Sequence, residues 1–323
     1  MPDIIDELLH SDEPSVRYKV RTGALGADDS APDIQALREE IRRSPRVRSL
    51  LAGMDGSGSM PWPPYRKWTG SHWVLALLAD IGYPPGDARI AGLVDQTAAW
   101  ALGQEAKVIA GRPRRCASQQ GNVLLSMVRL GFVDSRAREL AARLRSWQWP
   151  DGGWNCDVEP AASHSSFHES LIPMRGLAAY ARATRDAAAA TSARRAAELF
   201  LERRLYKRRS TGRTIDSRFT ALHYPYFWRY TILHALIGMA EQGLATDPRC
   251  ADALELLESK RLPGGGFPAE RRYYRVAAGP ETRGSGLTTV DWGPTSSGRR
   301  PRANELVSAE ALTVFRYAGR ELT

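Results

Sequence analysis

Apolar residues recur three and four positions apart along most of this 323-residue chain, which is the spacing that places them on one face of an α-helix. The most apolar runs predict helices over 69–82, 118–131, 163–179, 226–243 and 303–319. More highly charged runs predict further helices between them, over 90–102, 135–146, 193–205 and 247–260. No stretch alternates apolar and polar residues for long, so few strands are expected. The pattern therefore predicts an all-α fold.

The predicted helices form a degenerate repeat. The first three apolar helices start about 45 to 50 residues apart, a period typical of helix-pair repeats. Small residues such as Ala76, Gly176 and Gly238 lie in the apolar helices, as an inner ring of closely packed helices requires. We therefore predict an α/α toroid of about five to six helix hairpins over residues 48–323, in preference to an open solenoid, with residues 1–47 as an N-terminal helical cap.

Composition narrows the class of protein. The chain is 43% hydrophobic and 25% charged, as in globular proteins, and no stretch approaches 18 consecutive apolar residues, so no membrane span is expected. The N-terminus is acidic and unlike a secretory signal. Three cysteines (Cys116, Cys156, Cys250) are too few and too scattered for a disulfide framework. These features predict a cytoplasmic protein.

The charge balance is basic, with a net charge of +9. Arginine-rich runs lie at 42–48, 112–115, 203–209 and 299–302. They are explained either by solvated helix faces or by an anionic partner such as a diphosphate or a nucleic acid. The sequence contains no helix-turn-helix, zinc-finger or RNP motif. A non-catalytic helical-repeat module that binds protein or nucleic acid through this basic surface is the alternative to the enzyme described below.

One turn carries a specific motif. Leu144, Gln148, Gly152 and Trp154 match the L-x3-Q-x3-G-x-W core of the QW repeat. In this motif the chain resembles squalene–hopene and oxidosqualene cyclases, and the Asp-Gly-Gly-Trp loop at 151–154 resembles one in protein prenyltransferase β subunits. Weaker matches to the same motif begin at Leu50 and Leu257. The chain is thus similar to the terpenoid cyclase/protein prenyltransferase superfamily, most of all to stand-alone bacterial repeat proteins of that kind.

The resemblance implies a toroid whose central cavity binds an isoprenoid or another small hydrophobic or anionic substrate, and it favours an enzyme. The D-x-D-D acid motif of squalene cyclases and the D-D-x-x-D motif of class I terpene synthases are both absent from the chain. Aromatic and polar residues at the starts of the apolar helices are the expected substrate-binding groups, although large rings between helix layers are equally often structural. These are Trp68, His72, Trp73, Gln119, Tyr224, Tyr226, Trp228, Arg229 and Asn304.

A candidate metal site follows the QW-like turn. His164 and His168 are four residues apart, so within one helix they would share a face and could bind one zinc ion. Cys156 precedes them, and Cys116 precedes the previous apolar helix at the same end of a toroid. We therefore expect Cys116, Cys156, His164 and His168 as zinc ligands, with the two histidines as catalytic groups. The alternatives are a metal-free His/Cys acid–base site and purely structural roles.

Overall fold

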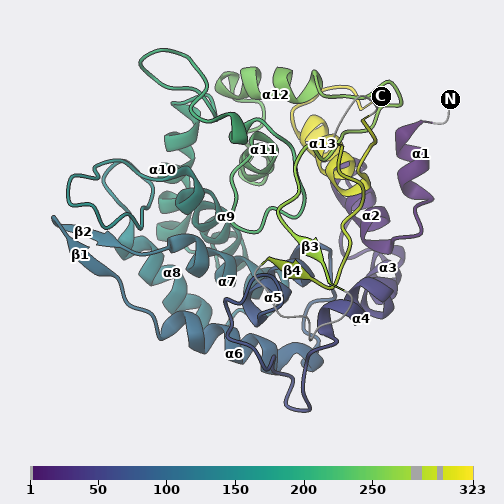
Figure 1. Ribbon diagram of the computed structural model, residues 1–323, viewed down its shortest axis with the longest axis horizontal. Helices are drawn as coiled ribbons and strands as arrows, with labels where there is room; N and C mark the ends of the chain where they lie inside the picture. Colours follow the sequence, from purple (N-terminus) through teal and green to yellow (C-terminus); the bar gives the residue numbers. More distant parts are fainter. Residues whose placement is uncertain (1–2, 278–285, 297–300, 323) are drawn as a thin grey trace.

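The computed structural model describes residues 3–277, 286–296 and 301–322; Arg299 and Arg300 of the last arginine-rich run lie outside them. Its helices form two concentric layers around a common centre (Figure 1). The inner layer consists of α2 (Pro14–Lys19) with the π-helical turn η1 (Val20–Ala24), α5 (Ser71–Asp80), α7 (Ala117–Arg129), α9 (Phe167–Thr184), α11 (Ile232–Ala240) and α13 (Glu305–Tyr317). The outer layer consists of α1 (Ile4–Leu9), α3 (Pro32–Arg43), α4 (Pro45–Leu51), α6 (Ala91–Leu102), α8 (Ser135–Trp147), α10 (Ala187–Leu201) and α12 (Ala251–Glu258).

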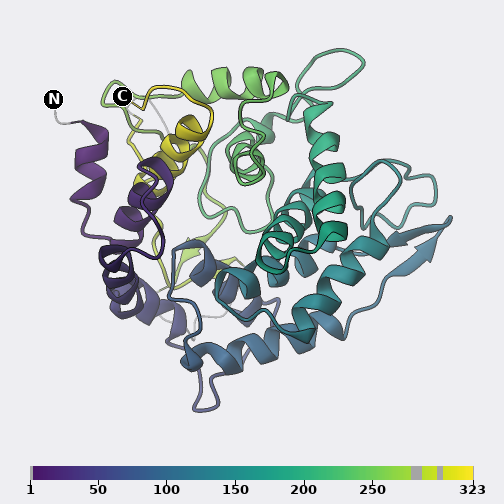
Figure 2. The ribbon, with the colours of Figure 1, turned by 180° about the vertical axis from the view of Figure 1, so that it is seen from behind.

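The inner helices contact one another in chain order from α5 to α13, and α13 then packs against α2 and η1. The ring closes between α2 and the end of α5, where Lys19 bonds Asp80 and Arg38 donates to the carbonyl of Gly82 at 3.0 Å. The view from behind shows the same closed arrangement (Figure 2). The predicted all-α fold and α/α toroid are confirmed.

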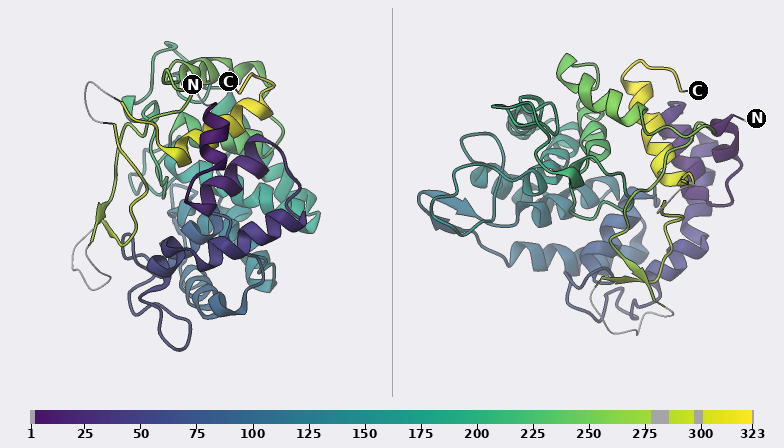
Figure 3. Two further views of the ribbon diagram at one scale, coloured as in Figure 1. Left: turned by 90° about the vertical axis from the view of Figure 1, so that its right-hand side faces the viewer. Right: turned by 45° about the horizontal axis from the view of Figure 1, so that its top comes forward.

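Strands contribute little to the described part of the chain. The strands β1 (Lys107–Ile109) and β2 (Arg112–Arg114) form an antiparallel hairpin, and β3 (Arg275–Val276) pairs in parallel with β4 (Leu287–Thr288). The segment with β3 and β4 lies on one side of the helical ring (Figure 3). None of the described helices is long and apolar enough to cross a lipid bilayer.

Capping residues set several helix starts. Asp134, Asp186, Thr231 and Asn304 each accept a hydrogen bond from the first turn of the helix they precede, which satisfies amide groups that have no partner within the helix. As a result, α10 begins six residues before the predicted start at 193. Conversely, α11 begins six residues after the predicted start at 226, because the helix starts at the Thr231 cap and the preceding residues form a loop.

The tightest helix pair is α7 with α9, and two glycines allow it. A Cβ atom on Gly121 would lie 2.6 Å from Cα of Pro173, and one on Gly176 would lie 2.8 Å from the carbonyl oxygen of Gly121. Both distances are well below a van der Waals contact. The two backbones therefore touch directly, which fixes the relative position of the two helices that carry the candidate site.

The first 47 residues take part in the ring. The segment α2–η1 packs against α13, and the Lys19 side chain reaches the centre of the molecule. The domain boundary after residue 47 stays a prediction, but α2 lies in the inner layer and is not a cap placed over it.

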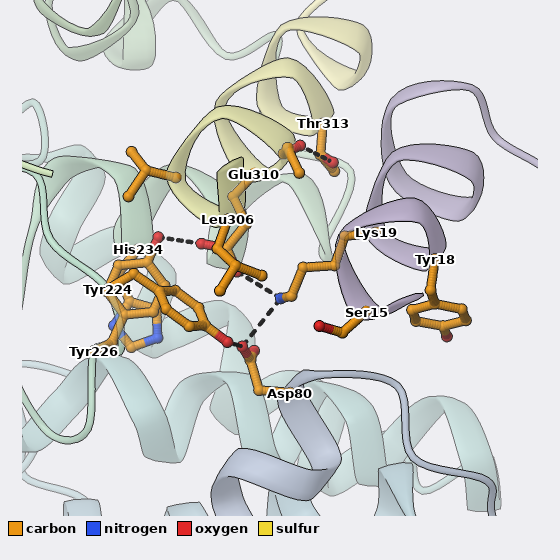
Figure 4. A network of polar contacts seen from close by, with 12 residues as sticks. Ser15, Tyr18, Lys19, Asp80, Tyr224, Tyr226, His234, Leu306, Glu310 and Thr313 are labelled. Atoms are coloured by element: carbon orange, nitrogen blue, oxygen red, sulfur yellow. Dashed lines mark hydrogen bonds and ion pairs between the residues drawn. The ribbon is translucent and has the colours of Figure 1, made fainter. Parts of the chain in front are cut away.

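Six charged residues meet at the centre, and we call them the central ion network: Lys19, Asp80, Arg129, Arg175, Glu241 and Glu310. Lys19 Nζ lies 3.0 Å from Asp80 and 2.7 Å from Glu310, and Figure 4 shows it between these two carboxylates. Arg129 bonds both Asp80 and Glu241. Five inner segments and the residue that follows α11 thereby supply three positive and three negative charges.

Neutral groups complete this network. Arg175 donates to Glu241 at 2.7 Å and to His234 Nε2 at 2.6 Å. Tyr224 donates to Asp80 at 2.6 Å, and Tyr226 donates to Glu310. Burial alone would raise the pKa of Asp80, but the positive charges of Lys19 and Arg129 outweigh it and hold that pKa below its usual range.

The first prediction concerns Lys19. Replacing it by methionine leaves the buried Glu310 and the partly buried Asp80 without the cation between them. Removing one partner of a buried ion pair costs about 3–5 kcal/mol. We expect Lys19→Met to lower the free energy of unfolding in urea by about that amount. The exposed Lys107→Met is the control and should change it by less than about 0.5 kcal/mol. Equal stability of the two variants would show that the network does not hold the ring together.

Candidate functional site

The centre of the ring is filled from one side by the loop before α11. Tyr224 and Tyr226 reach into the central ion network, and the ring of Phe227 stacks on Trp68 with centroids 3.6 Å apart and planes 9° apart. The space that remains is a cavity of about 50 Å³, bounded mainly by α5, α7, α9, this loop and His234. Pockets that bind drug-sized ligands measure about 300–1,000 Å³. The centre has room for one or two water molecules and not for an isoprenoid.

The residues expected to bind a substrate instead pack this centre or its rim. Trp73 is fully buried, and Trp68 is buried with its indole N–H donating to the carbonyl of Tyr273 at 3.0 Å. His72 lies among the rings of Tyr65, Trp73 and Trp100. Its Nε2 is 3.3 Å from Asn122 Nδ2, and burial lowers the pKa of His72 to about 3, so this histidine is neutral at physiological pH.

The remaining members of the set lie farther around the ring. Arg229 is stacked between Trp228 and Tyr273, with its guanidinium carbon 4.6 and 3.8 Å from the two ring centroids. Asn304 caps α13 and donates to the carbonyls of Trp292 and Pro294. Both side chains therefore have structural partners.

The QW-like turn joins three helices of the fold. Gln148, directly after α8, donates from Nε2 to the carbonyls of Gly152 and Ser192, the latter in α10. Trp154 donates from its indole to the carbonyl of Leu144, and its backbone N–H donates to Ser170 in α9. The turn also brings Cys156 to the start of α9.

Cys116 and Cys156 meet at the mouth of the ring, at the N-terminal ends of α7 and α9, and Glu169 joins them from the first turn of α9. The two Sγ atoms and a carboxylate oxygen of Glu169 all lie within 4.8 Å of one another. We call these three residues the cysteine–glutamate cluster. Cys156 Sγ is 3.6 Å from Glu169 Oε1, and the backbone N–H of Ser118 donates to Glu169 Oε2 at 3.0 Å.

The two thiols of the cluster have pKa values shifted in opposite directions. A hydrogen bond with Cys156 lowers the pKa of the Cys116 thiol, and the same bond raises the pKa of Cys156. Burial raises the pKa of Glu169, opposed by the Ser118 N–H. Cys116 also sits at the N-cap of α7, where the helix dipole favours a thiolate. Cys116 is thus the thiol of this pair that loses its proton first.

The structure separates the two histidines from the cysteines, which corrects the expected ligand set. Helix α9 begins at Phe167, so His164 lies in the preceding loop and shares no helix face with His168. The His164 side chain is exposed. His168 Nδ1 accepts the backbone N–H of Tyr230 at 2.9 Å, and burial lowers the pKa of His168 to about 4. Neither histidine belongs to the group of close ligand atoms around the cysteines.

Tyr65 and Gln119 adjoin the cluster. Burial raises the pKa of Tyr65 to about 12; a hydrogen bond with Gln119 opposes this shift, and the charges of Glu169, Cys116 and Cys156 add to it. The hydroxyl of Tyr65 therefore stays protonated and able to donate near the thiols. Gln119 was predicted to bind a substrate, and through its hydrogen bond with Tyr65 it lies beside this cluster.

The donor set fits zinc. Thiolate sulfur binds Zn²⁺ at about 2.3 Å and carboxylate oxygen at about 2.0–2.2 Å, so neighbouring donors of a tetrahedral site lie about 3.5–3.8 Å apart. The 3.6 Å between Cys156 Sγ and Glu169 Oε1 falls in that range. The other two donor distances are at most 4.8 Å, so each would have to contract by at most about 1 Å on zinc binding. Cys116, Cys156 and Glu169 would supply three ligands.

The residues that sequence analysis missed are isolated charges on apolar inner helices. Glu169 follows His168 directly, and Arg175 and Glu310 interrupt runs of apolar and small residues. Buried charges are rare unless they are paired or bind a metal. A single charge within an otherwise apolar helix was therefore the signal that could have found them.

Comparison with known proteins assigns no family to the chain. No family model and no curated protein matches the sequence. Among solved structures, a GH76 α-mannanase of Bacteroides thetaiotaomicron matches with 12% sequence identity and a TM-score of 0.45, over 98% of this chain and 92% of that chain. No activity is carried over at this level of similarity.

These findings correct the resemblance drawn from the QW-like motif. The matching solved structure is a glycoside hydrolase, and no comparison returns a terpenoid cyclase or a prenyltransferase. The predictions of that superfamily, and of a function on an isoprenoid or anionic substrate in a central cavity, are therefore wrong. The alternative of a repeat module that binds protein or nucleic acid has no support from the comparisons either. A central cavity of about 50 Å³ is too small for an isoprenoid, which is a physical reason why the predicted function is wrong.

Proposed function

We propose that the protein binds one zinc ion at the mouth of its ring, through Cys116, Cys156 and Glu169, in a site of the catalytic type. The observation that carries the proposal is the convergence of two sulfur atoms and one carboxylate oxygen within 4.8 Å. Structural zinc sites have four protein ligands, whereas catalytic sites have three and keep one position for water or substrate. Three donors from this chain match the second kind.

The residues in and beside the cluster differ in their protonation and in their hydrogen bonds. Cys116 is the more readily deprotonated thiol, and Glu169 is held in place by the Ser118 N–H. Burial raises the pKa of Tyr65 to about 12, so its hydroxyl stays protonated, and the charges of all three donors act on it. A zinc ion there would polarise a substrate carbonyl or lower the pKa of a bound water. We therefore propose metal-assisted hydrolysis or addition of water on a small molecule.

The site requires a reducing environment. Two free thiols this close would form a disulfide under oxidising conditions, and neither could then bind zinc as a thiolate. This requirement agrees with the cytoplasmic location predicted from the scattered cysteines, which we retain as part of the proposal.

The test is metal content after purification under reducing conditions. We expect one zinc per chain by elemental mass spectrometry. Removing a residue that only hydrogen-bonds to a zinc ligand already lowers zinc affinity about 10–100-fold. Removing a ligand itself should cost more, so Cys116→Ala, Cys156→Ala and Glu169→Gln should each weaken zinc binding by at least about 100-fold. Cys250→Ala is the matched control, because Cys250 is buried away from the cluster and its mutation should leave zinc binding unchanged. Zinc below 0.1 per wild-type chain, or equal loss in Cys250→Ala, would contradict the proposal.

Alkylation of the thiols gives an independent check. Without zinc, Cys116 should react with iodoacetamide faster than Cys250, because burial raises the pKa of Cys250 to about 12. One equivalent of zinc should slow the reaction of Cys116 and Cys156 at least about tenfold and leave Cys250 unaffected. Peptide mass spectrometry assigns each site. Equal rates with and without zinc would exclude thiolate coordination.

A further inference from the structure

A second concave site lies at the other end of the inner helices. It is a groove of about 520 Å³ between the C-terminal ends of α9 and α11 and the first half of α10. This volume lies within the range of small-molecule sites. We call it the arginine groove, and its lining consists of Ala178, Ala181, Arg182, Arg185, Asp186, Ala187, Ala190, Ala193, Arg194, Glu241 and Gln242.

We propose that the arginine groove binds a small organic anion, with the apolar body of the ligand on the alanines and its acidic group between the arginines. The proposal is independent of the zinc site, which lies at the N-terminal ends of α7 and α9. The groove's shape, its floor and its charge all favour such a ligand.

The floor of the groove is apolar. Ala178, Ala181 and Ala193 are buried, and Ala190 is exposed beside them. Alanine side chains leave room that larger residues would fill, so they form a smooth surface for hydrocarbon or an aromatic ring. Apolar walls with a few convergent polar groups are the usual composition of a ligand site.

In the part of the chain that the structure describes, the arginines of the groove form no ion pair with the two carboxylates that line it. Arg182 donates to the backbone carbonyl of Glu241 at 2.7 Å, which leaves its charge in place. Among the described residues, Arg185 has no hydrogen-bond or ion-pair partner. Arg194 acts electrostatically on Asp247, whose carboxylate already binds Arg249.

The acids of the groove are bound to arginines outside it. Glu241 accepts from Arg175 and Arg129 in the central ion network. Asp186 caps α10 and lies 3.7 Å from Arg145. Three guanidinium groups therefore face a cavity in which both carboxylates are already neutralised, so the groove favours an anion.

The helix ends do not reverse this preference. The C-terminal ends of α9 and α11 carry partial negative charge, but Arg182 covers the carbonyl that follows α11. The N-terminal end of α10, which begins at Ala187 in the groove wall, carries partial positive charge. Carboxylate, phosphate and sulfonate all present the planar or tripodal oxygens that guanidinium groups bind.

The test uses 8-anilinonaphthalene-1-sulfonate, a fluorescent probe with an aromatic body and one negative charge, on the full chain. We expect saturable binding of one probe per chain, at least about tenfold tighter than the uncharged N-phenyl-1-naphthylamine. Removing two charged hydrogen-bond donors in Arg185→Ala/Arg194→Ala should weaken the sulfonate at least about tenfold and leave the uncharged probe unchanged. Arg138→Ala, an exposed arginine on the outer helix α8, is the control and should change neither.

A second variant tests the floor. Ala190→Trp should fill the groove and abolish binding of the sulfonate, while circular dichroism and the thermal midpoint stay as in the wild type. The proposal is overturned if the wild type shows no saturable binding, if the double arginine variant binds the sulfonate like the wild type, or if a folded Ala190→Trp protein retains full binding.

Discussion

The structure depends on a balanced set of charges at its centre. Lys19, Arg129 and Arg175 meet Asp80, Glu241 and Glu310, and each of these side chains comes from a different inner segment or from the residue that ends it. Each charge is costly to bury alone and acceptable only beside its partners. In the observed packing of the inner helices, each of the six groups meets a partner of opposite charge. Because the same groups, with Tyr224 and Tyr226, occupy the centre, they leave no room there for a substrate.

The two candidate sites lie at opposite ends of the ring. At the N-terminal ends of α7 and α9, direct backbone contact at Gly121 and Gly176 sets the spacing that lets Cys116 approach Cys156 and Glu169. At the opposite end, Glu241 links the centre to the arginine groove, because it binds Arg175 and Arg129 inward and lines the groove outward. The central ion network thus supports both candidate sites without belonging to either.

Much of this architecture could be predicted from sequence, since helical periodicity, glycine stops and a 45–50-residue repeat reflect local geometry. The repeat also indicated that Cys116 and Cys156 would lie at the same end of neighbouring inner helices. The ligand set was harder, because it depended on the start of α9. A start at Phe167 removes His164 from the helix and places Glu169 beside the thiols. The loop that fills the centre, and the partners of Lys19 and Arg175, depend on contacts between distant segments that no local pattern encodes.

The QW-like motif shows how a correct local reading can lead to a wrong family. Gln148 and Trp154 join α8, α9 and α10 through backbone carbonyls and a serine. Any protein with paired helices can use such bonds, so the motif describes packing and not chemistry.

Zinc K-edge X-ray absorption on the purified protein tests the central claim most directly, namely that two thiols and one carboxylate at the mouth of the ring hold a metal. Coordination by the cluster predicts two sulfur atoms at about 2.3 Å and one or two oxygen atoms at about 2.0–2.2 Å, with one sulfur fewer in Cys156→Ala protein loaded with excess zinc. A first shell without sulfur, or a spectrum unchanged in that variant, would contradict it.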